Sequence, residues 1–310
     1  MRLHLAPMEG VVDWVMRDLL TRIGGIDQCT TEFIRVTNLK LPDAQFYKYC
    51  PELNTFSKTQ AGVPVFVQLL GGQPGPLVEN AYRVYELGAL GVDFNFGCPA
   101  KTVNRHDGGA TLLKNPERLY RILKMAREAL PESFPVTAKI RLGYDDPSRC
   151  VDLAQAVEAA GIKTLTVHCR TKMDMYKPPA YWEWIARIKE KVKLKIIANG
   201  EINTVQDLKR CQEVTGCEEF MIGRGAIKNP FLFLQIKALG ELDQPWFRQK
   251  ALLVDFFEGS RQFRDESYAI ARTKQWMSQL SKSSEEAHSA FQKLKTIRVS
   301  EEFKNQLIAL

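Results

Sequence analysis

The feature that most constrains the fold is a repeat of short apolar runs, each rich in β-branched residues and each followed by a segment of helical length. Eight such runs precede residue 240. They are Leu3 to Ala6, Gln28 to Glu32, Val63 to Leu69, Val92 to Asn95, Val136 to Arg141, Thr164 to His168, Lys195 to Ala198 and Glu219 to Ile222. The segments between them place apolar residues at helical spacing, and Asn115 before Pro116 is typical of a helix start. The pattern predicts alternating strands and helices.

Two α/β folds alternate strand and helix in this way: a closed (β/α)₈ barrel and a doubly wound open sheet. Eight units over about 230 residues match the barrel, which typically takes roughly 250. No G-x-G-x-x-G motif follows the first run, as a dinucleotide-binding open sheet would require. Polar and glycine-rich residues follow the strand ends all along the chain, where barrel enzymes place their chemistry. We therefore expect a (β/α)₈ TIM barrel.

The chain beyond residue 240 shows no further strand pattern and predicts four helices. Their apolar positions are Leu252, Leu253, Phe256 and Phe257, then Ile270, Thr273, Met277 and Leu280, then Ala287, Phe291 and Leu294 with Arg298, and last Phe303, Leu307 and Leu310. We interpret Gly240 to Pro245 as a linker between the strand-containing part of the chain and these helices. We expect a barrel domain over residues 1–240 and a small all-α helical bundle over residues 241–310.

The charge balance favours a polyanionic partner, because 43 Lys and Arg against 36 Asp and Glu give a net charge of +7. The excess is marked in the tail. Residues 272–298 carry Arg272, Lys274, Lys282, Lys293, Lys295 and Arg298 against Glu285 and Glu286. This stretch is either a solvated helical face or a patch that tracks the phosphates of a nucleic acid.

Cysteine usage and hydropathy indicate the cellular compartment in which the protein works. The seven cysteines are odd in number and show no C-x₂-C spacing, which argues against a disulfide framework and a structural zinc site. No run approaches the ~20 apolar residues that span a bilayer, and the N-terminus has no apolar leader. We expect a cytoplasmic protein, monomeric by default, with no membrane, metal or protein partner.

Residues after the seventh and eighth runs suggest a phosphate site. Gly200, Gly223 and Gly225 leave backbone N–H groups accessible at the place where barrels bind phosphate, and Arg224 can add a charged fork. The alternative is that these glycines serve only tight turns.

Three side chains inside or at the end of strands suggest a flavin. Lys139 lies within a predicted strand, where a buried charge needs a reason. Facing the barrel mouth, it can meet the electron-rich edge of a flavin ring, and Gln68 can hydrogen-bond the same edge. His168 is either another cofactor contact or a satisfied core histidine.

Cys98 stands in a Gly97-Cys98-Pro99 turn after the fourth run. A free cysteine is most often a small buried hydrophobe. This turn, however, faces the end of the barrel where chemistry occurs, and the polar loop from Ala100 to Gly109 that follows it resembles a substrate-gated lid. A thiol there can donate a proton to carbon while hydride arrives on the opposite face.

The motifs together resemble the signature of the tRNA-dihydrouridine synthases over essentially the full chain. The matching segments are Asn95 to Val103, Ala6 to Glu9, Thr31 to Arg35, Ala138 to Arg141, Val167 to Thr171 and Asn199 to Ile202. Within the family the chain looks most like the class that modifies uridine 16, the C class. The resemblance implies bound FMN, NADPH as reductant, and reduction of the C5=C6 bond of a flipped-out uridine in the tRNA D-loop. Hydride would pass from flavin N5 to C6, and Cys98 would protonate C5.

The resemblance also implies roles for named residues. FMN would be held by Pro7, Met8, Glu9, Gln68, Lys139, His168, Asn199, Gly200, Glu201, Gly223 and Arg224. Asn95 would orient the base, with Arg141, Arg170 and Tyr176 lining its pocket. Candidate tRNA contacts are Arg35 on the barrel and Arg272, Lys274, Trp276 and Lys295 on the bundle. Trp276 is alternatively a core residue. The uracil must be flipped out to meet a flavin, and recognition of the RNA then rests on shape and backbone.

Two other functions remain open at this point. An FMN barrel dehydrogenase or reductase of a free pyrimidine, of the dihydroorotate dehydrogenase type, shares the phosphate site and the lysine but does not explain the basic tail. An RNA-binding protein without chemistry explains the tail, but neither the Gly97-Cys98-Pro99 turn nor Lys139.

Overall fold

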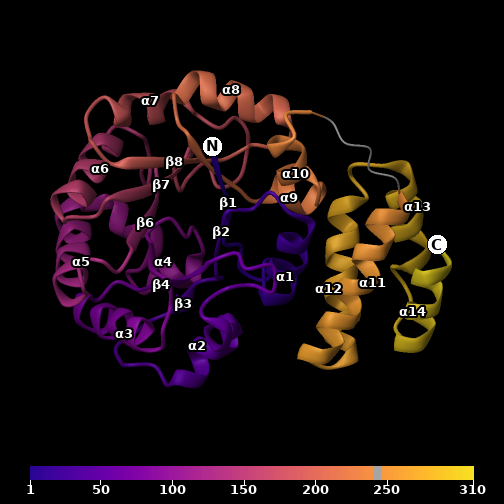
Figure 1. Cartoon of the computed structure of the whole chain (residues 1–310). Coiled ribbons are helices and arrows are strands. Elements are labelled where there is room, and N and C mark those ends of the chain that lie inside the picture. The colour runs from indigo at the N-terminus through magenta and orange to yellow at the C-terminus, as the bar shows by residue number, and fades with distance from the viewer. Residues whose placement is uncertain (241–245) are drawn as a thin grey trace.

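The computed structural model describes residues 1–240 and 246–310. Figure 1 shows a barrel with a helical domain beside it. Residues 241–245, most of the expected linker, lie outside the described residues.

The nine strands form a closed parallel barrel with one short addition. The strands are β1 (Arg2–Leu5), β2 (Gln28–Thr30), β3 (Ile34–Arg35), β4 (Val65–Leu70), β5 (Val92–Asn95), β6 (Val136–Arg141), β7 (Thr164–His168), β8 (Lys195–Asn199) and β9 (Glu219–Ile222). Their order is β2-β1-β9-β8-β7-β6-β5-β4-β3, and β2 also pairs with β4, which closes the ring. The expected barrel is confirmed and the open sheet is excluded. The short β3 was not expected; it pairs with the end of β4 at Ile34 and Leu69.

Helices cover the outside of the barrel. The longer ones are α1 (Trp14–Ile23), α3 (Pro74–Glu86), α5 (Pro116–Ala129), α6 (Cys150–Ala159) and α8 (Val205–Thr215), and short ones are α2 (Asp43–Tyr49), α4 (Lys101–Arg105), α7 (Glu183–Lys189), α9 (Arg224–Lys228) and α10 (Leu232–Lys237). Two 3-10 turns cover Pro51–Thr55 (η1) and Gly109–Lys114 (η2). The Asn115 side chain accepts a hydrogen bond from the backbone of Arg118, so the expected cap of α5 is present.

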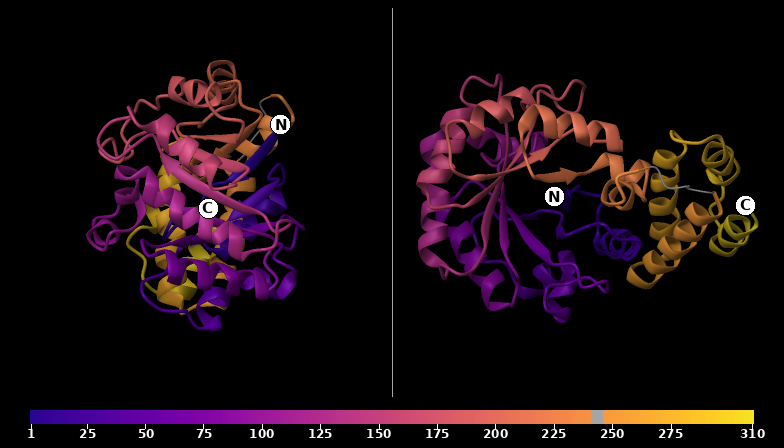
Figure 2. Two further views of the ribbon diagram at one scale, coloured as in Figure 1. Left: turned by 90° about the vertical axis from the view of Figure 1, so that its left-hand side faces the viewer. Right: turned by 45° about the horizontal axis from the view of Figure 1, so that its top comes forward.

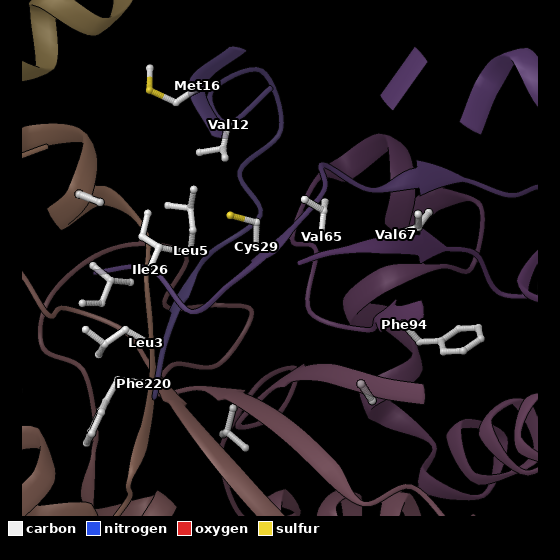
Figure 3. Close-up of a cluster of buried hydrophobic side chains, with 14 of the residues drawn as sticks. Leu3, Leu5, Val12, Met16, Ile26, Cys29, Val65, Val67, Phe94 and Phe220 are labelled. Atoms are coloured by element: carbon white, nitrogen blue, oxygen red, sulfur yellow. The ribbon is translucent and has the colours of Figure 1, made fainter. Parts of the chain in front are cut away.

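The strands place apolar side chains on their outer face and a mixture of polar and apolar side chains, including Ile197 and Met221, on their inner face. Leu3, Leu5, Val67 and Phe94 join the main core between strands and helices, and Figure 3 shows this cluster beside Val12 and Met16 of the α1 region. Several inward positions hold polar groups; the ring of His4, for example, contacts the Glu219 carboxylate at 2.9 Å. Because period-two alternation puts every second side chain inside, the barrel presents paired polar groups to its axis.

The tail forms the four expected helices: α11 (Trp246–Phe263), α12 (Glu266–Leu280), α13 (Glu285–Leu294) and α14 (Ser300–Ala309). Arg298 and Leu310, expected on the third and fourth helices, lie just beyond their ends. The tail packs through α11 and α12 against α1 and α9 of the barrel, and Figure 2 shows it against one flank. No helix within the described ranges combines the length and apolar character needed to cross a membrane.

Candidate active site

A cavity of about 570 Å³ opens at the carboxyl ends of the barrel strands, and α12 of the helical domain forms one of its walls. This volume lies within the usual range for sites that bind small molecules. Most of the residues expected to form the site line it: Pro7, Met8, Glu9, Gln68, Asn95, Cys98, Lys139, Arg141, His168, Tyr176, Asn199, Gly200, Glu201, Gly223, Arg224, Arg272 and Trp276.

Lys139 forms the floor of this cavity with Asn199. The Lys139 Nζ donates a hydrogen bond to Asn199 Oδ1 at 2.9 Å, and Asn199 Nδ2 donates to the carbonyl of Met221 at 2.8 Å. Burial, helped by the charge of Arg141, lowers the pKa of Lys139 to about 8. No carboxylate among the described residues forms an ion pair with this ammonium group. A buried cation without a carboxylate partner fits a ligand that presents an electron-rich or anionic edge.

A second polar chain orients Asn95. Asn95 Nδ2 donates to Gln68 Oε1 at 2.9 Å, and Gln68 Nε2 donates in turn to Asp93 Oδ2 at 2.7 Å. The other Asp93 oxygen accepts from the Thr137 hydroxyl at 2.6 Å. Asn95 Oδ1 accepts from the backbone N–H of Gly97 at 2.9 Å, so the same chain that orients the amide also fixes the turn carrying Cys98.

Cys98 lies on the cavity wall and is 9% exposed. Its carbonyl accepts hydrogen bonds from the backbone of Ala110 and from Asn104 Nδ2, both at 3.0 Å, which fold the following loop over it. Gly109 makes this fold possible, because it has a φ of +59° and a Cβ there would lie 2.9 Å from the Cys98 carbonyl. Burial raises the pKa of the Cys98 thiol above 9.0, so the group keeps its proton at neutral pH. The other six cysteines are buried away from the cavity.

Tyr176 forms part of the cavity rim between two guanidinium groups. Arg141 lies 5.1 Å and Arg224 5.4 Å from its ring centroid. Arg141 also donates to the carbonyls of Gly97 at 2.8 Å and Met175 at 2.7 Å, so it ties the cysteine turn to the Tyr176 loop. The side chain of Tyr176 remains 49% exposed, which leaves a ring face at the entrance available for stacking.

Glycines line the cavity at the ends of β8 and β9. A Cβ at Gly223 would lie 3.1 Å from Met8 Sδ, and one at Gly200, whose φ is +129°, would lie 3.1 Å from the His168 ring. Burial, and then the neighbouring cations, hold the pKa of His168 well below its usual range, so this ring is neutral at pH 7. The absent side chains leave a cradle beside Arg224, whose guanidinium can form charged hydrogen bonds with a phosphate.

Arg170 does not line the cavity, which corrects the expected substrate role. Its side chain is fully buried: Nε donates to the Lys177 carbonyl at 2.6 Å, and the guanidinium pairs with Glu201. Arg170 thus orients Glu201 and the loop that carries Tyr176 from the buried side of the cavity wall.

Two residues expected to contact tRNA are held at the domain interface. Arg272 donates to the carbonyls of Gly10 at 2.7 Å and Val11 at 2.8 Å, and pairs with Asp13. Trp276 is 2% exposed and donates through Nε1 to the Ile227 carbonyl at 3.0 Å. Because its ring is covered, the structure assigns Trp276 to packing, the alternative left open by the sequence, and corrects its expected role in contacting tRNA. Arg272 makes these contacts while also lining the cavity, and its contact with tRNA stays a prediction.

The remaining expected tRNA contacts lie outside the cavity. Arg35 is half-buried on β3, Lys274 donates to the Ile297 carbonyl, and Lys295 is exposed beside Gln292. Phe33, Gln275 and Gln279 line the cavity without having been expected there. The sequence alone could have indicated the two glutamines, because positions 272, 275, 276 and 279 lie on the same face of a helix. No cluster of three or more His, Cys, Asp or Glu side chains suited to a metal occurs in the described part of the chain.

Comparison with known proteins agrees with this geometry. The family model described as "Dihydrouridine synthase (Dus)" matches residues 4–309. A Pseudomonas putida protein named "tRNA-dihydrouridine(16) synthase" is 50% identical, covering 95% of this chain and 93% of its own. A Shewanella oneidensis protein of the same name is 48% identical, covering 97% and 96%.

Solved structures show the same fold at low identity. The old yellow enzyme homologue from Zymomonas mobilis superposes with a TM-score of 0.55 at 14% identity, over 78% of this chain and 90% of its own. Morphinone reductase gives a TM-score of 0.55 at 14% identity, over 79% and 87%.

Proposed function

The chain belongs to the dihydrouridine synthase family, and from that premise we propose that it is an oxidoreductase that reduces the C5=C6 bond of uridine 16 in the tRNA D-loop. The proposal includes FMN as the bound cofactor and NADPH as the reductant. The observation that carries it is the cavity shared by a protonated thiol, Cys98, and a buried ammonium group, Lys139.

The residues that line the cavity fit FMN. Lys139, Gln68 and His168 offer donors to the polar edge of a ring, while Met8 and Pro7 offer apolar contact. Gly200, Gly223 and Arg224, with Asn199 and Glu201, form the cradle that would take the ribityl phosphate. When bound and reduced, FMN supplies the hydride for C6 of the uracil.

The protein's own part of the chemistry is a proton transfer from Cys98. The thiol gives its proton to C5 as the C5=C6 double bond is reduced, and the resulting thiolate faces the positive charges of Arg141 and Arg35. Asn95, fixed through Gln68 and Asp93, is placed to hydrogen-bond the uracil edge. Tyr176 at the entrance offers a stacking face to an extruded base.

The domains divide the work in this proposal. The barrel, residues 1–240, carries the chemistry, and the helical domain, residues 241–310, helps bind tRNA through its basic residues. Lys274, Lys295 and Arg35 are the proposed contacts to phosphate. The enzyme acts as a cytoplasmic monomer without a metal or a protein partner.

The test compares three substrates with one flavin readout. The purified protein is expected to be yellow, to be bleached by NADPH under anaerobic conditions, and to regain its colour with tRNA lacking dihydrouridine. Free uracil and orotate should not restore the colour. Faster recovery with orotate than with tRNA would instead establish the free-pyrimidine enzyme.

Mapping by mass spectrometry fixes the position. Transfer RNA from cells lacking this protein should contain uridine at position 16, and expression of the gene should restore dihydrouridine there. Restoration at another position alone would disprove the assignment to uridine 16.

A further inference from the structure

Outside the cavity, two lysines approach the ring of one tyrosine. Lys114 Nζ lies 3.9 Å and Lys172 Nζ 4.8 Å from the ring centroid of Tyr144. The three residues come from separate segments: Lys114 ends η2, Tyr144 follows β6, and Lys172 follows β7. We refer to Lys114, Tyr144 and Lys172 as the Tyr144 cluster.

Backbone contacts connect the Tyr144 cluster to the cavity rim. The N–H of Lys172 donates to the Gly143 carbonyl at 2.9 Å, and that of Met173 donates to Tyr144 at 3.1 Å. Arg141, the last residue of β6, and Met175, in the loop after β7, both line the cavity, and Arg141 donates to the Met175 carbonyl at 2.7 Å. Lys114 closes the segment that folds over Cys98. The cluster therefore adjoins the entrance through which a base must pass.

Within residues 1–240 and 246–310, neither lysine of the Tyr144 cluster forms an ion pair with a carboxylate. The Lys172 Nζ donates to Met173 Sδ at 3.7 Å. An aromatic face attracts an ammonium group without cancelling its charge, and it limits the conformations of a flexible side chain. Two like charges held beside one ring attract an anion that both can reach.

We propose that the Tyr144 cluster binds backbone phosphate of the tRNA next to the nucleotide that enters the cavity. This rests on the proposed function, because the strand beside a flipped uridine presents phosphates at the mouth of the cavity. The ring fixes the two ammonium groups, and they in turn hold the RNA in register with Cys98. The cluster lies on the barrel, separate from the basic residues of the helical domain.

The test substitutes both lysines with glutamine, K114Q/K172Q, in the full-length flavin-loaded protein. The KM for unmodified tRNA is expected to rise about tenfold while kcat changes little. The slope of log(kcat/KM) against log(salt) should fall by about 1 to 2, because each lost phosphate contact removes about 0.7 of a unit. The matched control is K191Q/K193Q, which removes two exposed lysines between α7 and β8, at the opposite end of the barrel.

The role of the ring is tested separately. Tyr144→Phe keeps the ring and should leave the KM for tRNA near wild type, whereas Tyr144→Leu should raise it several-fold. Equal KM values for these two variants would overturn the role given to the ring.

The outcomes separate this inference from the function on which it rests. If wild-type protein reduces tRNA but K114Q/K172Q matches K191Q/K193Q in KM and salt slope, the cluster does not bind RNA. A rise confined to the KM for NADPH would assign the cluster to the reductant's phosphates and overturn the proposal. If wild-type protein itself does not reduce tRNA, the failure lies in the proposed function.

Discussion

Arg272 in the helical domain and Asp13 in the barrel form an ion pair of 2.9 Å in which both side chains are about nine-tenths buried. Asp13 also caps α1 by accepting from the backbone of Met16 at 3.0 Å, and it accepts from the Tyr268 hydroxyl at 3.2 Å. Arg272 reaches past it to the carbonyls of Gly10 and Val11. One pair thus joins α12, the start of α1 and the loop that carries Glu9.

Removing the Arg272 charge should destabilise the protein. Arg272→Met leaves the Asp13 carboxylate buried without its cation, and we expect a loss of about 3 kcal/mol in the free energy of unfolding. Urea denaturation measures it. Asp13→Asn is the matched partner, since its amide oxygen can still cap α1, and the double variant should lose less than the two single variants summed. Strict additivity would show that the pair contributes nothing as a pair.

Cys98→Ala should separate the two halves of the reaction. The rate of flavin reduction by NADPH is expected to stay at the wild-type value, while the rate at which tRNA reoxidises the flavin should fall at least about 100-fold. Single-turnover kinetics of pre-reduced enzyme measure the second rate. A variant that kept this rate would show that another group supplies the proton.

The pH profile of that step follows from the raised pKa of Cys98. The thiol is the proton-donating form, and burial keeps it protonated above the ordinary value of 9.0. The single-turnover rate should therefore remain level from pH 7 to 9 and decline only at higher pH. A decline that began near pH 7 would mean that the acid has an ordinary or lowered pKa.

Lys139→Met should stabilise the flavin-free protein and weaken flavin binding. Because folding lowers the pKa of Lys139 from 10.5 to about 8, the folded state carries a costly buried charge below pH 8. The folded protein binds fewer protons than the unfolded chain between pH 8 and 10.5, so this cost disappears as pH rises through that window. We expect the variant to be more stable by about 2 kcal/mol at pH 7, after allowing for the lost Asn199 hydrogen bond.

Urea denaturation of both flavin-free proteins from pH 7 to 10.5 measures this difference. It should shrink toward high pH, and comparison with wild type removes the contribution of the cysteines that titrate in the same range. A difference independent of pH would show that Lys139 is not a buried cation.

Gly223→Ala should weaken binding of FMN without unfolding the protein. The added methyl group would lie 3.1 Å from Met8 Sδ, the end of a flexible side chain that can move, but it fills part of the cradle. We expect about a tenfold rise in the Kd for FMN, or about 1.4 kcal/mol, by fluorescence titration. Gly75→Ala is the control, since a Cβ at that position contacts nothing within 4 Å. Equal Kd values for the two variants would place the phosphate elsewhere.

The sequence predicted the barrel well because period-two and helical patterns are local. Four strands, those beginning at Val92, Val136, Thr164 and Glu219, have the expected bounds. The short β3 was not predicted, because a strand of two residues is too short to show the alternation of apolar and polar side chains. Only the pairing of these residues with Leu69 and Leu70 makes them a strand.

The errors in the site arose from partners distant in the chain. Arg272 stands in a basic stretch, but its partners within the protein lie about 260 residues earlier, where no local pattern points to them. Arg170 follows a strand end, as cavity residues do, yet its guanidinium turns inward to Glu201. Strand ends indicate which residues gather at the mouth; tertiary packing decides which of them face the ligand.

Because α12 supplies a wall of the cavity, the barrel and the helical domain are not separable modules in this chain. A barrel severed from its tail would keep Cys98 and Lys139 but be open on the side now closed by Gln275 and Gln279. Exchanging tails between related enzymes would therefore reshape the chamber at the mouth of the barrel as well.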